Sequence, residues 1–170
     1  LVLPAYILEN VDFGRAVLYR DVYRKPVVFD EVKYEGDFEQ RWGNLSPEEM
    51  AHRFWQGTIA GTYVGHGETY KHPQDVLWWS KGGRLKGESS LRIGFLRQLM
   101  EEAADHLEPL EPSWVWTRVS AARAGDTWLY YFGEHQPRRW VFGLPSDPGD
   151  YLVDLIDPWE MTVTPIPVSP

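Results

Sequence analysis

Residues 26–31 read Pro-Val-Val-Phe-Asp-Glu, a short apolar run that ends in two carboxylates. An uninterrupted apolar run of this length is typical of a buried parallel strand. Side chains alternate along a strand, so Glu31 shares one face with Val27 and Phe29 while Asp30 points to the other. If the strand belongs to a barrel, Glu31 faces the mouth, where (β/α)₈ enzymes keep their active sites. Glu31 is therefore a candidate catalytic residue.

Glu35 follows four residues later, in the predicted loop, and could reach the same mouth as a substrate-binding group. The alternative for Glu35 is a loop carboxylate that is exposed to water. A second short strand, residues 62–68, again ends in ionisable groups, with His66 and Glu68 on one face. Both are candidates for binding a sugar hydroxyl or orienting a carboxylate. His66, Glu68 and His72 follow no recognised metal-ligand spacing, so no metal is predicted.

Helices are expected between these strands. Residues 10–23 favour a short helix, and Ser46-Pro47-Glu48-Glu49 is a capping box that opens a helix running to about residue 60. Another helix begins at Ser89 or Ser90 and extends to about residue 106. The long loop at 70–88 contains Trp78 and Trp79, which are candidates for stacking on a sugar, although both could instead pack inside the loop.

The character of the chain changes at residues 108–112, a linker with two prolines. Every segment after it reads as a strand, including a hairpin around the turn at 124–126. The order is helix–strand–helix–strand–helix and then all-β, which predicts an α/β region at 1–107 and a β region at 113–170.

Composition excludes several classes of function. The chain has 170 residues, no cysteine and a formal net charge of -8, so disulfides, thiol nucleophiles and a nucleic-acid surface are not expected. No apolar run approaches the roughly 18 residues that a membrane span needs, and no membrane partner is expected. A whole (β/α)₈ barrel needs about 250 residues, more than this sequence provides.

Several stretches together resemble a group of bacterial glycosidases that are similar to family-5-type and apiosidase-type glycoside hydrolases. They are KPVVFDEVKYEGD, WGNLSPEEMAHRFWQGT, GTYVGHGETY, LWWSKGGRLKGESSLRIGFLR and LYYFGEHQPRRWVF…LIDPWEMTV. The resemblance implies that residues 1–107 are the last βα units of a (β/α)₈ TIM barrel and that 113–170 form an antiparallel β-sandwich of unassigned function. It also implies that Glu31 is the nucleophile, at the end of barrel strand seven. The acid/base would lie on strand four, which this sequence does not contain.

We therefore expect a fragment of a retaining glycoside hydrolase that carries the nucleophile and is inactive alone. The alternative is a non-catalytic carbohydrate-binding or structural module. The expected partner is a carbohydrate, with no cofactor, and the missing part of the barrel or an oligomer mate would cover the open sheet edges. A cytoplasmic location is the working expectation.

Overall fold

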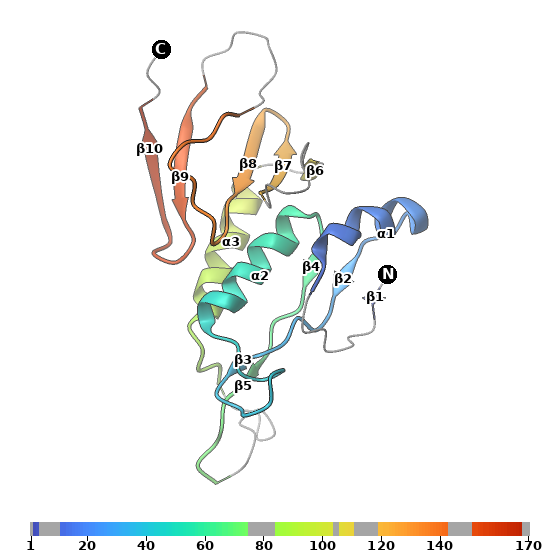
Figure 1. Cartoon of the computed structure of the whole chain (residues 1–170), viewed down its shortest axis with the longest axis vertical. Coiled ribbons are helices and arrows are strands. Elements are labelled where there is room, and N and C mark those ends of the chain that lie inside the picture. Colours follow the sequence, from blue (N-terminus) through green and yellow to red (C-terminus); the bar gives the residue numbers. More distant parts are fainter. Residues whose placement is uncertain are drawn as a thin grey trace.

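Two helices, α2 (Pro47–Ile59) and α3 (Ser89–Ala103), form the centre of the computed structural model. It describes residues 2–3, 11–74, 84–103, 106–110, 119–142 and 151–167. Figure 1 shows short parallel strands on one side of these helices and antiparallel strands at one end. None of the helices in these residues is long and apolar enough to cross a membrane.

The parallel strands are very short and form two small sheets. The strands β1 (Val2–Leu3), β2 (Val28–Phe29) and β4 (Tyr63–Val64) pair in the order β1-β2-β4. Further along the same segments, β3 (Glu35–Gly36) pairs in parallel with β5 (Glu68–Thr69). The segments that follow β2 and β4 therefore run side by side through both sheets.

The expected TIM-barrel architecture is wrong for this structure. Barrel closure requires each strand to pair on both sides around a complete ring. The described strands instead form an open three-stranded parallel sheet and separate small sheets, with no barrel. The antiparallel β-sandwich expected after residue 112 is also replaced by small sheets. The order of helices and strands along the chain correctly indicated parallel pairing. It does not show how many strands pair, and closure of a barrel depends on that number.

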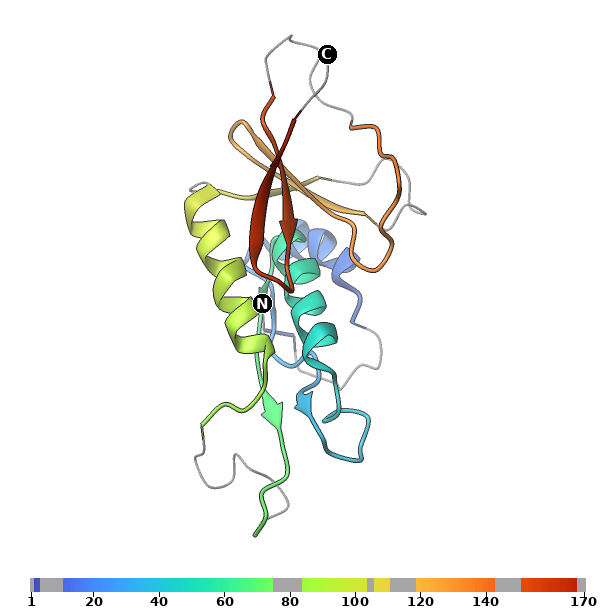
Figure 2. The same cartoon turned by 90° about the vertical axis from the view of Figure 1, so that its left-hand side faces the viewer.

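The C-terminal strands form two antiparallel units. The strands β6 (Glu108–Leu110), β7 (Ser120–Ala124) and β8 (Thr127–Tyr131) make one sheet, with β7 in the middle. The strands β9 (Val153–Asp157) and β10 (Thr162–Ile166) form a separate hairpin. Figure 2 shows the turn of this hairpin beside α2 and α3.

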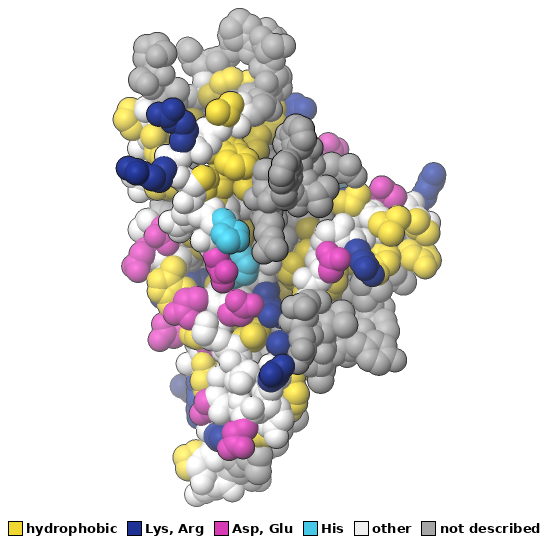
Figure 3. Space-filling model, viewed as in Figure 1, with side chains coloured by type: hydrophobic (Ala, Val, Ile, Leu, Met, Phe, Trp, Pro, Cys, Tyr) yellow, Lys and Arg dark blue, Asp and Glu magenta, His cyan; other side chains and the backbone are white. Residues whose placement is uncertain are grey.

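The first helical segment consists of the 3₁₀ turn η1 (Phe13–Arg15) and α1 (Ala16–Tyr23). Arg20 donates to the carbonyls of Ala60 and Gly61, at 3.4 and 3.3 Å, which ties α1 to the end of α2. The opposite side of α1 leaves hydrophobic side chains exposed, as Figure 3 shows.

The helix α2 begins where its capping box predicts. The hydroxyl of Ser46 accepts from the N–H of Glu49 at 3.2 Å, and Pro47 occupies the first turn. Its buried side recurs at helical spacing and includes Met50, Phe54 and Trp55. These side chains pack with Phe29 and Leu96 of the neighbouring elements in the hydrophobic core.

Gly57 lets α2 approach the sheet closely. A Cβ atom at this position would overlap the side chain of Val64 and lie 2.8 Å from the ring of Phe13. Gly94 in α3 has nothing within 4 Å of the same position. Both positions are glycine within a helix, but only Gly57 is closely packed against neighbouring side chains.

We expect Gly94→Ala to stabilise the protein by about 0.5–1 kcal/mol, because alanine favours the helix. Gly57→Ala should lower the free energy of unfolding by about 1–3 kcal/mol, because the added methyl group overpacks the contact with Val64. Urea denaturation followed by tryptophan fluorescence measures both changes. Equal stabilisation by the two substitutions would show that α2 does not approach the sheet this closely.

Candidate functional site

Acidic and histidine side chains follow β2 and β4 at the same end of the parallel sheet. Val28 pairs with Tyr63 and Phe29 with Val64, so the residues after each strand are neighbours. The N–H of Gly65 donates to the carbonyl of Phe29 at 2.8 Å, which continues this pairing. The predicted residues Glu31 and His66 consequently leave the sheet at the same end.

Glu31 lies two residues after β2 and is half-buried. Its carboxylate lies near the hydroxyl of Tyr34. Burial, together with the nearby carboxylate and negative charge of Glu31, raises the pKa of Tyr34 above its ordinary value. Tyr34 therefore stays protonated beside the carboxylate.

The backbone around Glu31 is fixed from two directions. Arg53 of α2 donates through Nη1 to the carbonyl of Val32 at 2.7 Å, and it also binds the carboxylate of Glu49 at 2.9 Å. The ring of Tyr34 packs edge-on against Trp42 and lies over Gly67, where a Cβ atom would overlap it. These contacts hold the turn that presents Glu31.

Glu35 is completely buried and has hydrogen-bond donors on both carboxylate oxygens. Oε1 accepts from the hydroxyl of Tyr70 at 2.9 Å and from the N–H of Glu88 at 2.8 Å. Oε2 accepts from the N–H of Ser89 at 3.2 Å and from its hydroxyl. The carboxylate thus caps the start of α3, where helix N–H groups lack partners and favour negative charge.

Glu68 lies opposite Glu35 in the β3–β5 pair and is also buried. It accepts from the N–H of Lys86 at 2.7 Å and from that of Gly87 at 3.1 Å. The two carboxylates together bind four successive backbone N–H groups, those of residues 86–89. This segment leads directly into α3.

His66 connects this cluster to the end of β4. Its Nε2 lies 3.2 Å from the hydroxyl of Ser89 and 4.0 Å from Oε1 of Glu68. The imidazole packs against the ring of Phe54 and keeps 18% of its side chain exposed. Of the three side chains in this cluster, His66 therefore has the most contact with solvent.

The ligand atoms of Glu35, His66 and Glu68 lie within 4.8 Å of one another, a spacing that could hold a metal ion. Each of the four carboxylate oxygens, however, already accepts at least one hydrogen bond. A cation would have to displace these donors, and His72 is not a member of the group. The donor set therefore favours a hydrogen-bonded cap for α3 over a metal centre.

The remaining predicted residues, Trp78 and Trp79, lie outside the described residues, and their role stays a prediction. The structure adds Tyr34, Tyr70 and Ser89, which the sequence reading did not select. Tyr34 and Tyr70 each follow a predicted site residue by two or three positions, a spacing that could have indicated them. Nothing in the sequence pairs Ser89 with Glu35, because 54 positions separate the two.

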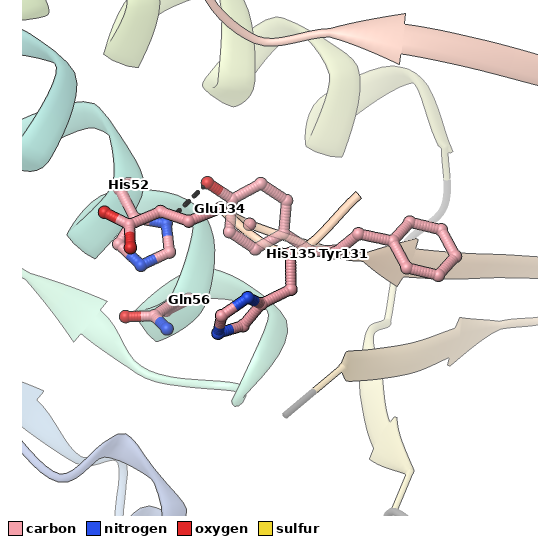
Figure 4. Close-up of a pocket in the computed structure, with 7 residues that line it drawn as sticks. His52, Gln56, Tyr131, Glu134 and His135 are labelled. Atoms are coloured by element: carbon pink, nitrogen blue, oxygen red, sulfur yellow. Dashed lines mark hydrogen bonds between the residues drawn. The ribbon is translucent and has the colours of Figure 1, made fainter. Parts of the chain in front are cut away.

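A second polar group lies between α2 and the end of β8 (Figure 4). The hydroxyl of Tyr131 and Nδ1 of His52 are 2.8 Å apart, and the ring of Tyr131 stacks on Trp55. A small hollow here is lined by His52, Gln56, Tyr131, Phe132, Gly133, Glu134 and His135. In Figure 3, histidine and acidic side chains gather near the middle of the visible face.

Comparison with known proteins finds one similar solved structure and one matching family model. Over 92% of its length it is similar to the crystal structure of a "putative glycoside hydrolase from Bacteroides vulgatus ATCC 8482", with a TM-score of 0.77 and 40% sequence identity. The match covers 32% of that protein, so this chain spans about a third of its length. Residues 116–169 match the family described as "Domain of unknown function (DUF5605)". A search of curated proteins finds no match.

The two acidic residues Glu31 and Glu35 should respond differently to removal of their charge. Glu35→Gln places an amide NH₂ against buried donors and should lower the free energy of unfolding by about 2–4 kcal/mol. Glu31→Gln removes a half-buried charge and should change it by less than about 1 kcal/mol. Chemical denaturation of both variants tests this, and a similar loss for the two would contradict the capping role of Glu35.

The burial of His52 between α2 and the end of β8 should make stability depend on pH. Burial lowers the pKa of His52 below its ordinary value of 6.5, although the charges of Glu49 and Glu134 offset part of this effect. The unfolded chain therefore takes up a proton first as the pH falls. Stability contributed by neutral His52 should be present above pH 6.5 and be lost as the pH falls through that value towards the lower folded-state pKa.

Denaturation of the wild type and His52→Gln between pH 8 and 5 checks this expectation. Glutamine can still bond to the hydroxyl of Tyr131 but does not titrate. The variant should show a shallower loss of stability in the same interval. An unchanged dependence on pH would mean that His52 does not contribute to it.

Proposed function

We propose that this chain is part of a retaining glycoside hydrolase and that Glu31 is its nucleophile. The similarity to a protein described as a "putative glycoside hydrolase", at 40% identity over most of this chain, supports the reaction class. The assignment of Glu31 rests on the contrast between the three glutamates. Glu35 and Glu68 are buried and bind the start of α3, whereas Glu31 is half-buried beside Tyr34.

Retaining hydrolysis proceeds in two displacements at the anomeric carbon. A carboxylate oxygen of Glu31 attacks that carbon, and the bond to the leaving oxygen breaks as a second carboxylic acid gives that oxygen its proton. The second residue then takes a proton from water, whose oxygen attacks the anomeric carbon and releases Glu31. The two carboxyl groups would lie about 5–5.5 Å apart.

In this proposal the acid/base comes from a part of the enzyme outside these 170 residues, and this chain alone is inactive. Tyr34 stays protonated beside Glu31, since burial and the charge of Glu31 raise its pKa. Arg53 holds the adjacent carbonyl of Val32, which restricts the backbone that carries the nucleophile. A fixed orientation of this kind lowers the entropic cost of attack.

The substrate in this proposal is a carbohydrate. His66 is placed to bond a sugar hydroxyl, because its imidazole leaves the sheet at the same end as Glu31 and keeps contact with solvent. Glu35 and Glu68 contribute to carbohydrate binding indirectly, since they hold the segment from residue 86 to residue 89 next to His66. Trp78 and Trp79 are proposed as stacking surfaces for the sugar.

Glu31→Gln in the full-length enzyme is expected to reduce kcat/KM by at least about 10³-fold, because an amide cannot form the glycosyl ester. Glu39→Gln is the matched control, since Glu39 lies in the following loop with 85% of its side chain exposed. The assay would use a panel of aryl pentosides and hexosides. Full activity of the Glu31 variant on a cleaved substrate would disprove the assignment.

A chemical trap tests the nucleophile independently. Dinitrophenyl 2-deoxy-2-fluoroglycosides carry a leaving group that needs no acid, and the fluorine slows release of the ester. Incubation should add one glycosyl group, which peptide mass spectrometry should locate on Glu31. Binding of oligosaccharides by full-length protein that neither reacts with the trap nor cleaves any glycoside would favour the non-catalytic binding module instead.

A further inference from the structure

We propose that Trp159, in the turn between β9 and β10, is a positioning residue for the cluster formed by Glu35, His66 and Ser89. The turn belongs to the segment that matches the family of unknown function. The proposal gives that segment a role, which is to fix the first turn of α3. Its importance for catalysis rests on the proposed function, whereas its effect on position does not.

The turn is ordered by its own hydrogen bonds before it meets the helix. Oδ1 of Asp157 accepts from the N–H groups of Trp159 and Glu160, each at 2.9 Å. Met161 completes the turn with a φ of 55°, in the left-handed region. The carbonyl and indole ring of Trp159 are thereby presented together on one side of the turn.

Arg92 of α3 binds both of these groups. Its Nε donates to the carbonyl of Trp159 at 3.1 Å, and its guanidinium carbon lies 4.0 Å from the centre of the indole ring. A guanidinium in this position gains from both the hydrogen bond and the cation–π contact. Only 16% of the Arg92 side chain is exposed, so this contact is largely shielded from water.

The same guanidinium reaches back to the start of the helix. Nη1 of Arg92 donates to the carbonyl of Glu88 at 3.1 Å. The N–H of Glu88 donates in turn to Glu35, and so does that of Ser89. Arg92 therefore connects the turn of the hairpin to the peptide groups that cap the buried carboxylate.

Ser89 extends the connection to His66. Its hydroxyl bonds to Glu35 and lies 3.2 Å from Nε2 of the imidazole. A shift in the first turn of α3 would move this hydroxyl and change the hydrogen bond at Nε2. The position of Trp159 is thus coupled to the environment of His66 through Arg92 and Ser89.

The hairpin contacts the rest of the molecule close to this turn. Its strands leave large side chains exposed, among them Leu155 at 60% and Val163 at 44%. Ile156 packs against the hydrophobic core, one residue before Asp157. Ile156 and Trp159 thus both contact the rest of the molecule close to the turn, so loss of the Trp159 contact should affect the helix.

The effect of Trp159 on the position of the first turn of α3 can be tested without any substrate. We expect Trp159→Ala in the full chain to shift the ¹⁵N resonances of the His66 imidazole and to speed amide exchange at Glu88 and Ser89 by at least tenfold. Trp159→Phe retains an aromatic face and should restore most of the wild-type spectrum. Arg97→Gln, which breaks an exposed ion pair with Glu101 on the same helix, is the control and should leave both readouts unchanged.

Arg92→Lys provides a second route if Trp159→Ala does not fold. Lysine keeps the positive charge but cannot bond to both Trp159 and Glu88 as the planar guanidinium does, so it should give the same two changes. Wild-type resonances and exchange rates in a folded variant that lacks the contact would overturn the proposal.

Kinetics of the full-length enzyme then separate this proposal from the proposed function. A lower kcat with little change in KM for Trp159→Ala would support coupling to catalysis. An unchanged kcat would overturn that coupling, while the spectra decide the positional claim. Failure of the Glu31 assignment would appear in the Glu31→Gln assay and leave the spectroscopic result intact.

Discussion

The buried carboxylate of Glu35 is the constraint on which the arrangement of the site depends. A charge without solvent contact must be matched by donors, and here the first N–H groups of α3 provide them. The match fixes the start of α3 relative to β3 and leaves no room for a side chain at Gly87, where a Cβ atom would overlap the carboxyl group. Helix position and carboxylate burial are therefore interdependent.

This constraint also separates the acidic residues by role. Glu35 and Glu68 accept hydrogen bonds from protein groups on each oxygen, so both are committed to holding residues 86–89. Glu31 lies between β2 and β3 and stays half-buried, with Tyr34 near its carboxylate. A nucleophile needs a carboxylate oxygen that can reach a substrate, and of these three glutamates the proposed one, Glu31, is the least buried.

Local sequence patterns predicted local structure well, but they did not predict contacts between residues far apart in the sequence. The capping box placed the start of α2 at Pro47, and the turn at Gly125 placed the β7–β8 hairpin. Glu35 could equally have been an exposed loop carboxylate, because its partners lie 35 to 54 positions away in the sequence. The barrel expectation was wrong because element order and family resemblance do not determine how many strands pair.

The C-terminal β region is attached to both central helices, and each attachment reaches one side of the candidate site. Tyr131 binds α2 through His52 and Trp55, and α2 carries Arg53, which holds the backbone next to Glu31. Trp159 binds Arg92 of α3. The carboxylate of Glu35 caps the start of the same helix. Each attachment therefore restricts the helix that it contacts, in addition to the packing of the two helices in the core. The β region thus contacts both of the helices that border the candidate site.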